Sequence, residues 1–145
     1  MKNYLIFKMP HQILYQGAEA VISLQDNKIV KDRIKKSYRL KEIDEKLRFR
    51  RTKSEAKIIE KLKNIIAVPK IIRTDKENIL MGYIQGKKLS EYLEKLNYKE
   101  ICRQLGEILT KLHNQDIIHG DLTTSNMIYV ENKENPNKSQ LAKQS

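Results

Sequence analysis

Segments of strand character come first in this chain and segments of helical periodicity come second, and this order restricts the fold more than any other feature. Runs rich in Ile, Leu and Val, separated by turn residues, predict strands at Tyr4–Lys8, Ile13–Gln16, Ala20–Leu24 and Lys28–Lys31. Asp26-Asn27 is a tight-turn pair before the last of these. Two further strands are predicted over 68–72 and 79–84. The pattern indicates an antiparallel meander with one helical insertion.

The insertion and the region after the last strand both show helical spacing. Leu40, Ile43 and Leu47 recur at intervals of three and four residues. Thr52 and Glu55 have the spacing of a capping box, which predicts that a second helix begins there. Farther along, Ser90 is expected to cap a short helix over 91–96, and an apolar face predicts a longer helix over 99–114.

These elements predict an α+β fold with two lobes. We assign residues 1–84 to a first lobe built of strands and helix. Residues 85–130 form the start of a helical second lobe, and a brief strand is predicted at 127–130. Residues 131–145 are nearly all polar, and we expect them to be a disordered tail.

Charge is the clearest signal in the composition. The net charge is +11, and residues 31–63 contain 14 basic and 6 acidic side chains. Such a concentration favours a polyanionic partner, with RNA as the first candidate, whereas the alternative is an ordinary solvated surface. A single cysteine, Cys102, excludes an intramolecular disulfide framework, and no apolar run is long enough to span a bilayer. We therefore expect a cytoplasmic protein without a membrane partner.

The sequence His119-Gly120-Asp121-Leu122-Thr123-Thr124-Ser125-Asn126 carries the strongest indication of chemistry. Phosphoryl transfer needs a carboxylate that orients or deprotonates the attacking hydroxyl or water, and an oxygen ligand for Mg²⁺. Asp121 and Asn126, five residues apart on a loop between a helix and a strand, can supply these two groups. Asp, Asn and Thr are also frequent in loops for turn reasons alone.

Two earlier groups fit the same chemistry. Lys31 lies on a strand after a turn and can bind the α- and β-phosphates of a nucleotide, with Glu55 as its acidic partner from the following helix. Alternatively, Lys31 is one surface lysine among many, and Glu55 closes the capping box. The turn Gln16-Gly17-Ala18-Glu19-Ala20 occupies the place of a phosphate-covering hairpin, although it contains a single glycine.

The loop at 119–126 resembles the signature loop of the small atypical, RIO-like serine/threonine kinase of the KEOPS complex, the PRPK type. Residues 16–20 resemble the reduced phosphate turn of that family, and residues 29–33 resemble its ATP-lysine strand. Residues 38–39 and 50–56 resemble its basic helix region, with Glu55 at the ion-pair position. Residues 80–86 resemble its hinge, except that Gly82 stands where an acidic residue is usual.

The resemblance implies a protein-kinase-like bilobal fold, with a small antiparallel N-lobe sheet plus a helix and a helical C-lobe. It implies that ATP and Mg²⁺ bind. The implied residues are Asp121 as the catalytic residue, Asn126 as a metal ligand, and Lys31, Glu55, Gly17, Ala18, Glu19, Met81 and Tyr83 at ATP. The family continues after residue 130 into an Asp-Phe-Gly motif that this sequence does not contain, and we interpret the C-lobe as truncated.

The resemblance also implies an activity and partners. The activity is ATP hydrolysis or serine/threonine phosphorylation in the KEOPS complex, which makes threonylcarbamoyladenosine on tRNA. The implied partners are the threonylcarbamoyl-transferase subunit, other KEOPS subunits, and tRNA through the basic region 31–63. Two alternatives stay open: a non-catalytic remnant that binds tRNA or a subunit, and a small-molecule phosphotransferase, since that class shares a His-Gly-Asp-Leu loop.

Overall fold

The computed structural model describes residues 12–118, 123–132, 134 and 139–143. The chain divides into two compact units, Met1–Ala56 with Ile71–Tyr83, and Lys57–Lys70 with Ile84–Ser145. The first unit differs from the predicted first lobe in residues 57–70. These residues belong to the second unit because Leu62 and Ile66 are buried in its hydrophobic core. The strand predicted at 4–8 lies outside the described residues.

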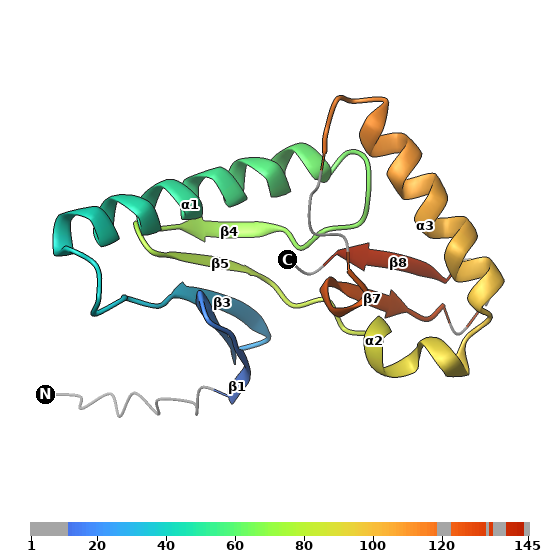
Figure 1. The fold of residues 1–145 in the computed structure, drawn as a ribbon. Coiled ribbons are helices and arrows are strands. Elements are labelled where there is room, and N and C mark those ends of the chain that lie inside the picture. Colours follow the sequence, from blue (N-terminus) through green and yellow to red (C-terminus); the bar gives the residue numbers. More distant parts are fainter. Residues whose placement is uncertain (1–11, 119–122, 133, 135–138, 144–145) are drawn as a thin grey trace, which may run out of the picture. The chain divides into compact units, whose positions relative to one another are not determined.

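The first unit contains a five-stranded sheet (Figure 1). Its strands are β1 (Gln12–Gln16), β2 (Ala20–Gln25), β3 (Lys28–Arg33), β4 (Ile71–Thr74) and β5 (Asn78–Gly82), in the order β1-β2-β3-β5-β4. All neighbouring pairs are antiparallel. Asp26 and Asn27 both have positive φ, at 47° and 57°, and join β2 to β3. This confirms the predicted turn, because a two-residue hairpin of this kind needs left-handed backbone at both positions.

Helix α1 (Lys41–Leu62) is one continuous helix, so the predicted second start at Thr52 is wrong. Its buried positions in the first unit are Asp44, Arg48, Thr52 and Ala56, spaced four residues apart. This spacing places them on one face of the helix. Arg, Lys, Glu and Ser surround Thr52 and none of them breaks a helix, so capping-box spacing alone does not begin a new one. The apolar core of this unit includes Ile29, Ile79 and Met81.

The second unit contains a three-stranded sheet and the helices that the structure describes after α1. Its elements after α1 are β6 (Lys87–Lys88), α2 (Leu89–Tyr92), the 3-10 helix η1 (Leu93–Lys95), α3 (Tyr98–His113), the 3-10 helix η2 (Thr124–Asn126), β7 (Met127–Val130) and β8 (Gln140–Lys143). The sheet order is β6-β7-β8. Ser90 lies inside α2 and not at its cap, which is Lys88. Asn97 caps α3 by accepting a hydrogen bond from the Glu100 N–H.

Strand β8 corrects the expectation of a disordered tail. Its residues Gln140–Lys143 pair with β7, and Leu141 and Ala142 are 4% and 2% exposed. The Lys143 N–H donates to the Ala67 carbonyl at 2.9 Å. The polar composition of this segment was therefore misleading, because two buried apolar residues and backbone pairing are enough to order it within the core of the unit. In the described part of the chain, no helix has the length and apolar character that crossing a membrane requires.

Candidate nucleotide-binding site

Lys31 and Glu55 meet in the first unit. Lys31 lies on β3 between β2 and β5, opposite Ile22 and Ile79, and Glu55 lies on α1. The Lys31 Nζ donates to Glu55 Oε1 at 2.7 Å, and both side chains are 16% exposed. The structure thus brings together the lysine and the carboxylate that we predicted as partners from the sequence, in which they are 24 positions apart.

Arg33 is a second cation on the same carboxylate, and it was missed at the level of sequence. Its Nη2 donates to Glu55 Oε2 at 2.6 Å, and its side chain is 13% exposed. Arg33 lies two residues after Lys31 on β3, so both side chains leave the same face of the sheet. The alternation of side chains along a strand is the sequence signal that could have identified Arg33 as a neighbour of Lys31.

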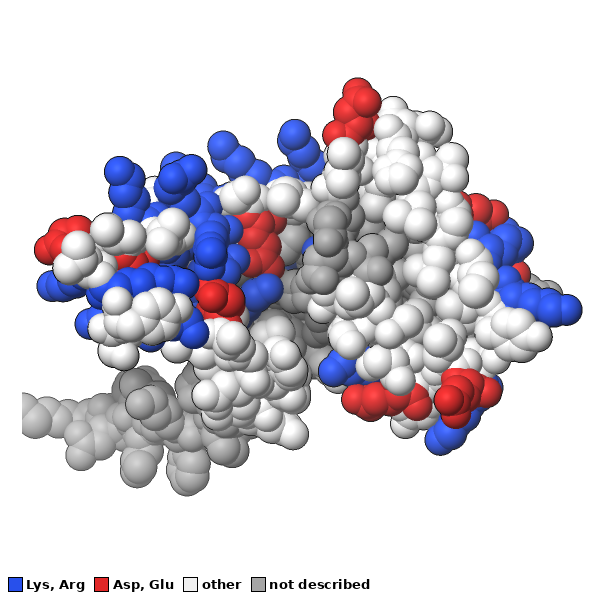
Figure 2. Space-filling view, in the orientation of Figure 1, with Lys and Arg blue, Asp and Glu red and all other residues white. Residues whose placement is uncertain are grey.

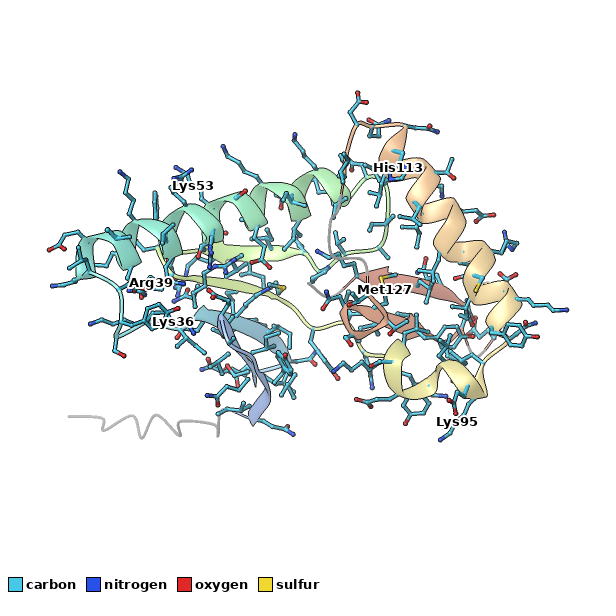
Figure 3. The ribbon with its side chains drawn as sticks, viewed as in Figure 1. Lys36, Arg39, Lys53, Lys95, His113 and Met127 are labelled. Carbon is cyan, nitrogen blue, oxygen red and sulfur yellow. The ribbon has the colours of Figure 1, made fainter. Side chains whose placement is uncertain are left out.

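The predicted phosphate turn, residues 17–19, is tied to the segment between β3 and α1 and to α1 itself. The Gly17 N–H donates to the Ala20 carbonyl at 3.0 Å, and the Ile34 N–H donates to the Glu19 carbonyl at 3.1 Å. The Lys36 Nζ donates to the Ala18 carbonyl. Glu19 pairs with Arg51 at 2.5 Å, and its other oxygen lies 3.7 Å from Arg39. Lys36 and Arg39 come from the segment that enters α1 (Figure 3), and neither was predicted as a site residue.

A buried ion network holds that segment against α1. Asp44 has no exposed surface and accepts from Arg48 Nε at 2.7 Å and from the Lys36 N–H at 3.2 Å. Arg48 also pairs with Glu77, which precedes β5. Burial alone would raise the pKa of Asp44, but the hydrogen bonds from Arg48 and Lys36 outweigh it and hold the pKa below its ordinary value. Asp44 is therefore a fixed negative charge at the start of α1.

Of the remaining predicted residues, Met81 and Tyr83 belong to the first unit and Asn126 belongs to the second. Met81 on β5 is fully buried, so its side chain packs in the core of the first unit, and Tyr83 lies one residue after the end of β5. Asn126 is the last residue of η2 in the second unit. Asp121 lies outside the described residues, as do His119, Gly120 and Leu122.

Comparison with known proteins identifies the family. Residues 19–135 match the model of the RIO domain. The chain belongs to the RIO-domain family. It is 46% identical to the KEOPS complex subunit Bud32 of Pyrococcus abyssi, over 84% of this chain and 63% of that protein. It is 44% identical to a probable bifunctional tRNA threonylcarbamoyladenosine biosynthesis protein of Methanococcus maripaludis, over 86% of this chain and 24% of that protein. The chain thus spans less than two thirds of either relative.

A solved structure confirms the predicted kinase-like α+β fold. The Rio2 kinase of Chaetomium thermophilum, in an ADP/Mg²⁺-phosphoaspartate complex, matches with a TM-score of 0.66 and 17% identity. The match covers 90% of this chain and 45% of that one. The RIO domain of the present chain therefore has the kinase fold, and its paired Lys31 and Glu55 lie within the matched range 19–135.

Proposed function

We propose that this chain belongs to an ATP-dependent serine/threonine kinase or ATPase of the KEOPS complex, acting in the threonylcarbamoyladenosine modification of tRNA. The observation that carries the proposal is the 2.7 Å pair of Lys31 and Glu55 inside a RIO domain. The names of the relatives support the KEOPS assignment, since one is a KEOPS complex subunit and another is a probable bifunctional tRNA threonylcarbamoyladenosine biosynthesis protein.

The described residues fit a nucleotide phosphate in their chemistry. Lys31, Arg33 and Glu55 together carry one positive charge in excess. The turn at Gly17 to Glu19 belongs to the hairpin that precedes β3, the strand of the two cations. In this proposal Lys31 binds phosphate oxygens, and Glu55 holds the lysine in place. Asn126 would hold Mg²⁺, which supplies charge neutralisation at the phosphates, and Asp121 would orient the attacking hydroxyl or water.

The test is ATP binding and hydrolysis by the full chain. Lys31→Met should weaken ATP binding, and Asp121→Ala should abolish hydrolysis while the chain still binds ATP. Lys28→Met is the matched control, because Lys28 lies on the same strand and is exposed. ATP turnover that survives Asp121→Ala, or equal losses for the Lys28 and Lys31 variants, would refute the proposal. Phosphate transfer to a small hydroxylated compound alone would instead favour the small-molecule phosphotransferase.

The outer face of α1 supports tRNA as a ligand of the first unit. Lys46, Arg50 and Lys53 are exposed and are spaced four and three residues apart, so they lie on one face of the helix. Figure 2 shows basic side chains gathered over α1, and Lys53 points outward from it in Figure 3. Such a row can neutralise successive phosphates of a nucleic acid backbone.

Salt dependence tests this surface. Changing Lys46, Arg50 and Lys53 to Gln should weaken binding of an unmodified tRNA and lower the slope of log affinity against log salt by about 2 to 3, since each lost phosphate contact removes roughly 0.7 to 0.9. The control changes three exposed lysines of the second unit, Lys95, Lys99 and Lys111, to Gln and removes the same charge. If both triple variants lower the slope equally, the α1 face has no special role.

The proposal also includes assembly with other KEOPS subunits, the threonylcarbamoyl-transferase subunit first. Co-purification of the full chain with that subunit, followed by measurement of the complex mass, tests this part. Failure to associate at concentrations well above micromolar would remove the partner from the proposal and leave the nucleotide chemistry unaffected.

A further inference from the structure

The carboxylate of Glu55 is shared between two cations, one on each oxygen. Oε1 accepts from Lys31 at 2.7 Å, and Oε2 accepts from Arg33 at 2.6 Å. The three side chains are only 13% to 16% exposed. A carboxylate so shielded from water is costly to leave without a partner, because neither solvent nor another donor replaces the lost bonds.

The charges of this cluster do not cancel. Two cations and one carboxylate leave one positive charge in excess. Asp32 lies between the two cations in the sequence, but neighbouring residues of a strand point to opposite faces, and Asp32 is exposed. A phosphate group, with several charged oxygens, is the kind of ligand that balances such an excess.

The two cations are suited to different tasks. The guanidinium of Arg33 is planar, always charged and rigid, so it is the better permanent partner for a carboxylate. The ammonium of Lys31 has three donors on a flexible stem and can turn toward a second anion. If Lys31 were the sole cation, Glu55 and the phosphate would share one ammonium, and the pairing of Glu55 would weaken whenever that ammonium moved toward the phosphate.

We propose that Arg33 is a positioning residue, which keeps Glu55 in place and so leaves Lys31 free to bind nucleotide phosphates. The proposal rests on the proposed function, because it assumes that Lys31 serves a nucleotide. Arg33 acts through Glu55 and does not itself contact phosphate. Loss of Arg33 should therefore weaken the binding of ligands that carry phosphates and leave the binding of ligands without phosphates unchanged.

Calorimetric binding of ATP and of adenosine to the full chain tests this distinction. Arg33→Gln should lower ATP affinity by about tenfold or more, the size expected when a charged hydrogen bond is disturbed, and should leave adenosine affinity unchanged. Arg73→Gln is the matched control, since Arg73 is a 68% exposed arginine of the same sheet that pairs with Asp75. This control should change neither affinity.

A second background separates positioning from direct contact. In the Glu55→Gln chain, Arg33→Gln should weaken ATP binding no further, because the residue through which Arg33 acts is gone. An undiminished loss there would mean that Arg33 binds phosphate itself, and it would overturn the positioning role. Equal losses for ATP and adenosine, or a loss of the same size on Arg73→Gln, would overturn it as well.

Two further outcomes are decisive. Arg33→Lys keeps a cation beside Glu55 and should retain most of the ATP affinity, which gives a usable variant if Arg33→Gln does not fold. An Arg33→Lys chain that binds adenosine normally but loses ATP completely would contradict the proposal. An unchanged chain that binds no ATP would refute the proposed function first, before any variant is compared, and the positioning role would fall with it.

Discussion

Two glycines of the second unit should respond in opposite directions to the same substitution. A Cβ atom on Gly86 would clash with Ile128 Cγ2 and would lie 2.6 Å from the carbonyl oxygen of Tyr129. Both atoms would be well inside van der Waals contact with the Cβ, and the second belongs to the backbone. Tyr129 belongs to β7, which pairs with β6 on one side and β8 on the other, so that backbone cannot move aside without disturbing two strand pairings.

Gly106 provides the opposite case. It lies inside α3, and a Cβ built on it meets no atom within 4 Å. Glycine in a helix interior costs about 0.5 to 1 kcal/mol relative to alanine because it loses more backbone entropy on folding. Gly106→Ala should therefore stabilise the unit by that amount. Gly86→Ala should destabilise it by about 1 to 3 kcal/mol, the usual range for overpacking.

Thermal and urea unfolding followed by circular dichroism give the comparison. Both glycines lie in the second unit, so the same transition reports both variants. The two variants should differ by roughly 1.5 to 4 kcal/mol, and for a chain of this size each kcal/mol shifts Tm by about 2 to 4 °C. Equal stability of the two variants, or a stabilising Gly86→Ala, would refute the close approach of Gly86 to β7.

Three further predictions concern stability. The Thr52 hydroxyl is buried without a hydrogen-bond partner, so Thr52→Val should raise the free energy of unfolding by about 1 kcal/mol in urea titrations, while Thr52→Ser should not. Leu112 is fully buried in the core of the second unit, and Leu112→Ala should lower the free energy of unfolding by about 2 to 5 kcal/mol. Leu109→Ala, at an exposed position of the same helix, should lower it far less. Hydrogen bonds from Arg103 and Gln104 hold the pKa of Glu100 at about 2 instead of 4.5, so its stabilising effect is complete above about pH 4.5 and is lost as the pH falls toward 2. The stability difference between the unchanged chain and Glu100→Gln should shrink over that range, and a constant difference would contradict the pairing.

The strands of the first unit could be predicted because local signals agreed with the final fold. β2 and β3 are rich in β-branched residues, and Asp26-Asn27 supplies the left-handed turn that joins them. Helix α3 was predictable for a similar reason, since its apolar positions follow helical spacing, and Ile101, Ile108 and Leu112 among them are buried. In each case the residues that decide the structure lie close together in the sequence.

Long-range pairing explains what the sequence did not reveal. Strand β8 exists because it pairs with β7 and meets Ala67, which lies more than 70 residues earlier, and its own composition is that of a polar tail. The capping box at Thr52 failed because a capping signature matters only where the chain leaves helical geometry, and here the buried face of α1 continues through it. The role of Arg33 could have been predicted only by combining the alternation of side chains along β3 with the position of Glu55 on α1.

The basic region 31–63 shows how one composition contains two kinds of charge. Lys31, Arg33, Arg39, Arg48, Arg51 and Lys63 form ion pairs with carboxylates, and they are six of its 14 basic side chains. Arg48 is buried and its charge is neutralised by Asp44. Substitution of Arg48 should therefore lower stability and leave RNA affinity unchanged. Lys46, Arg50 and Lys53 face solvent on the same helix. We expect a surface that binds a nucleic acid backbone to consist mainly of exposed cations such as these three, because they are open to solvent and are not held in a buried ion pair.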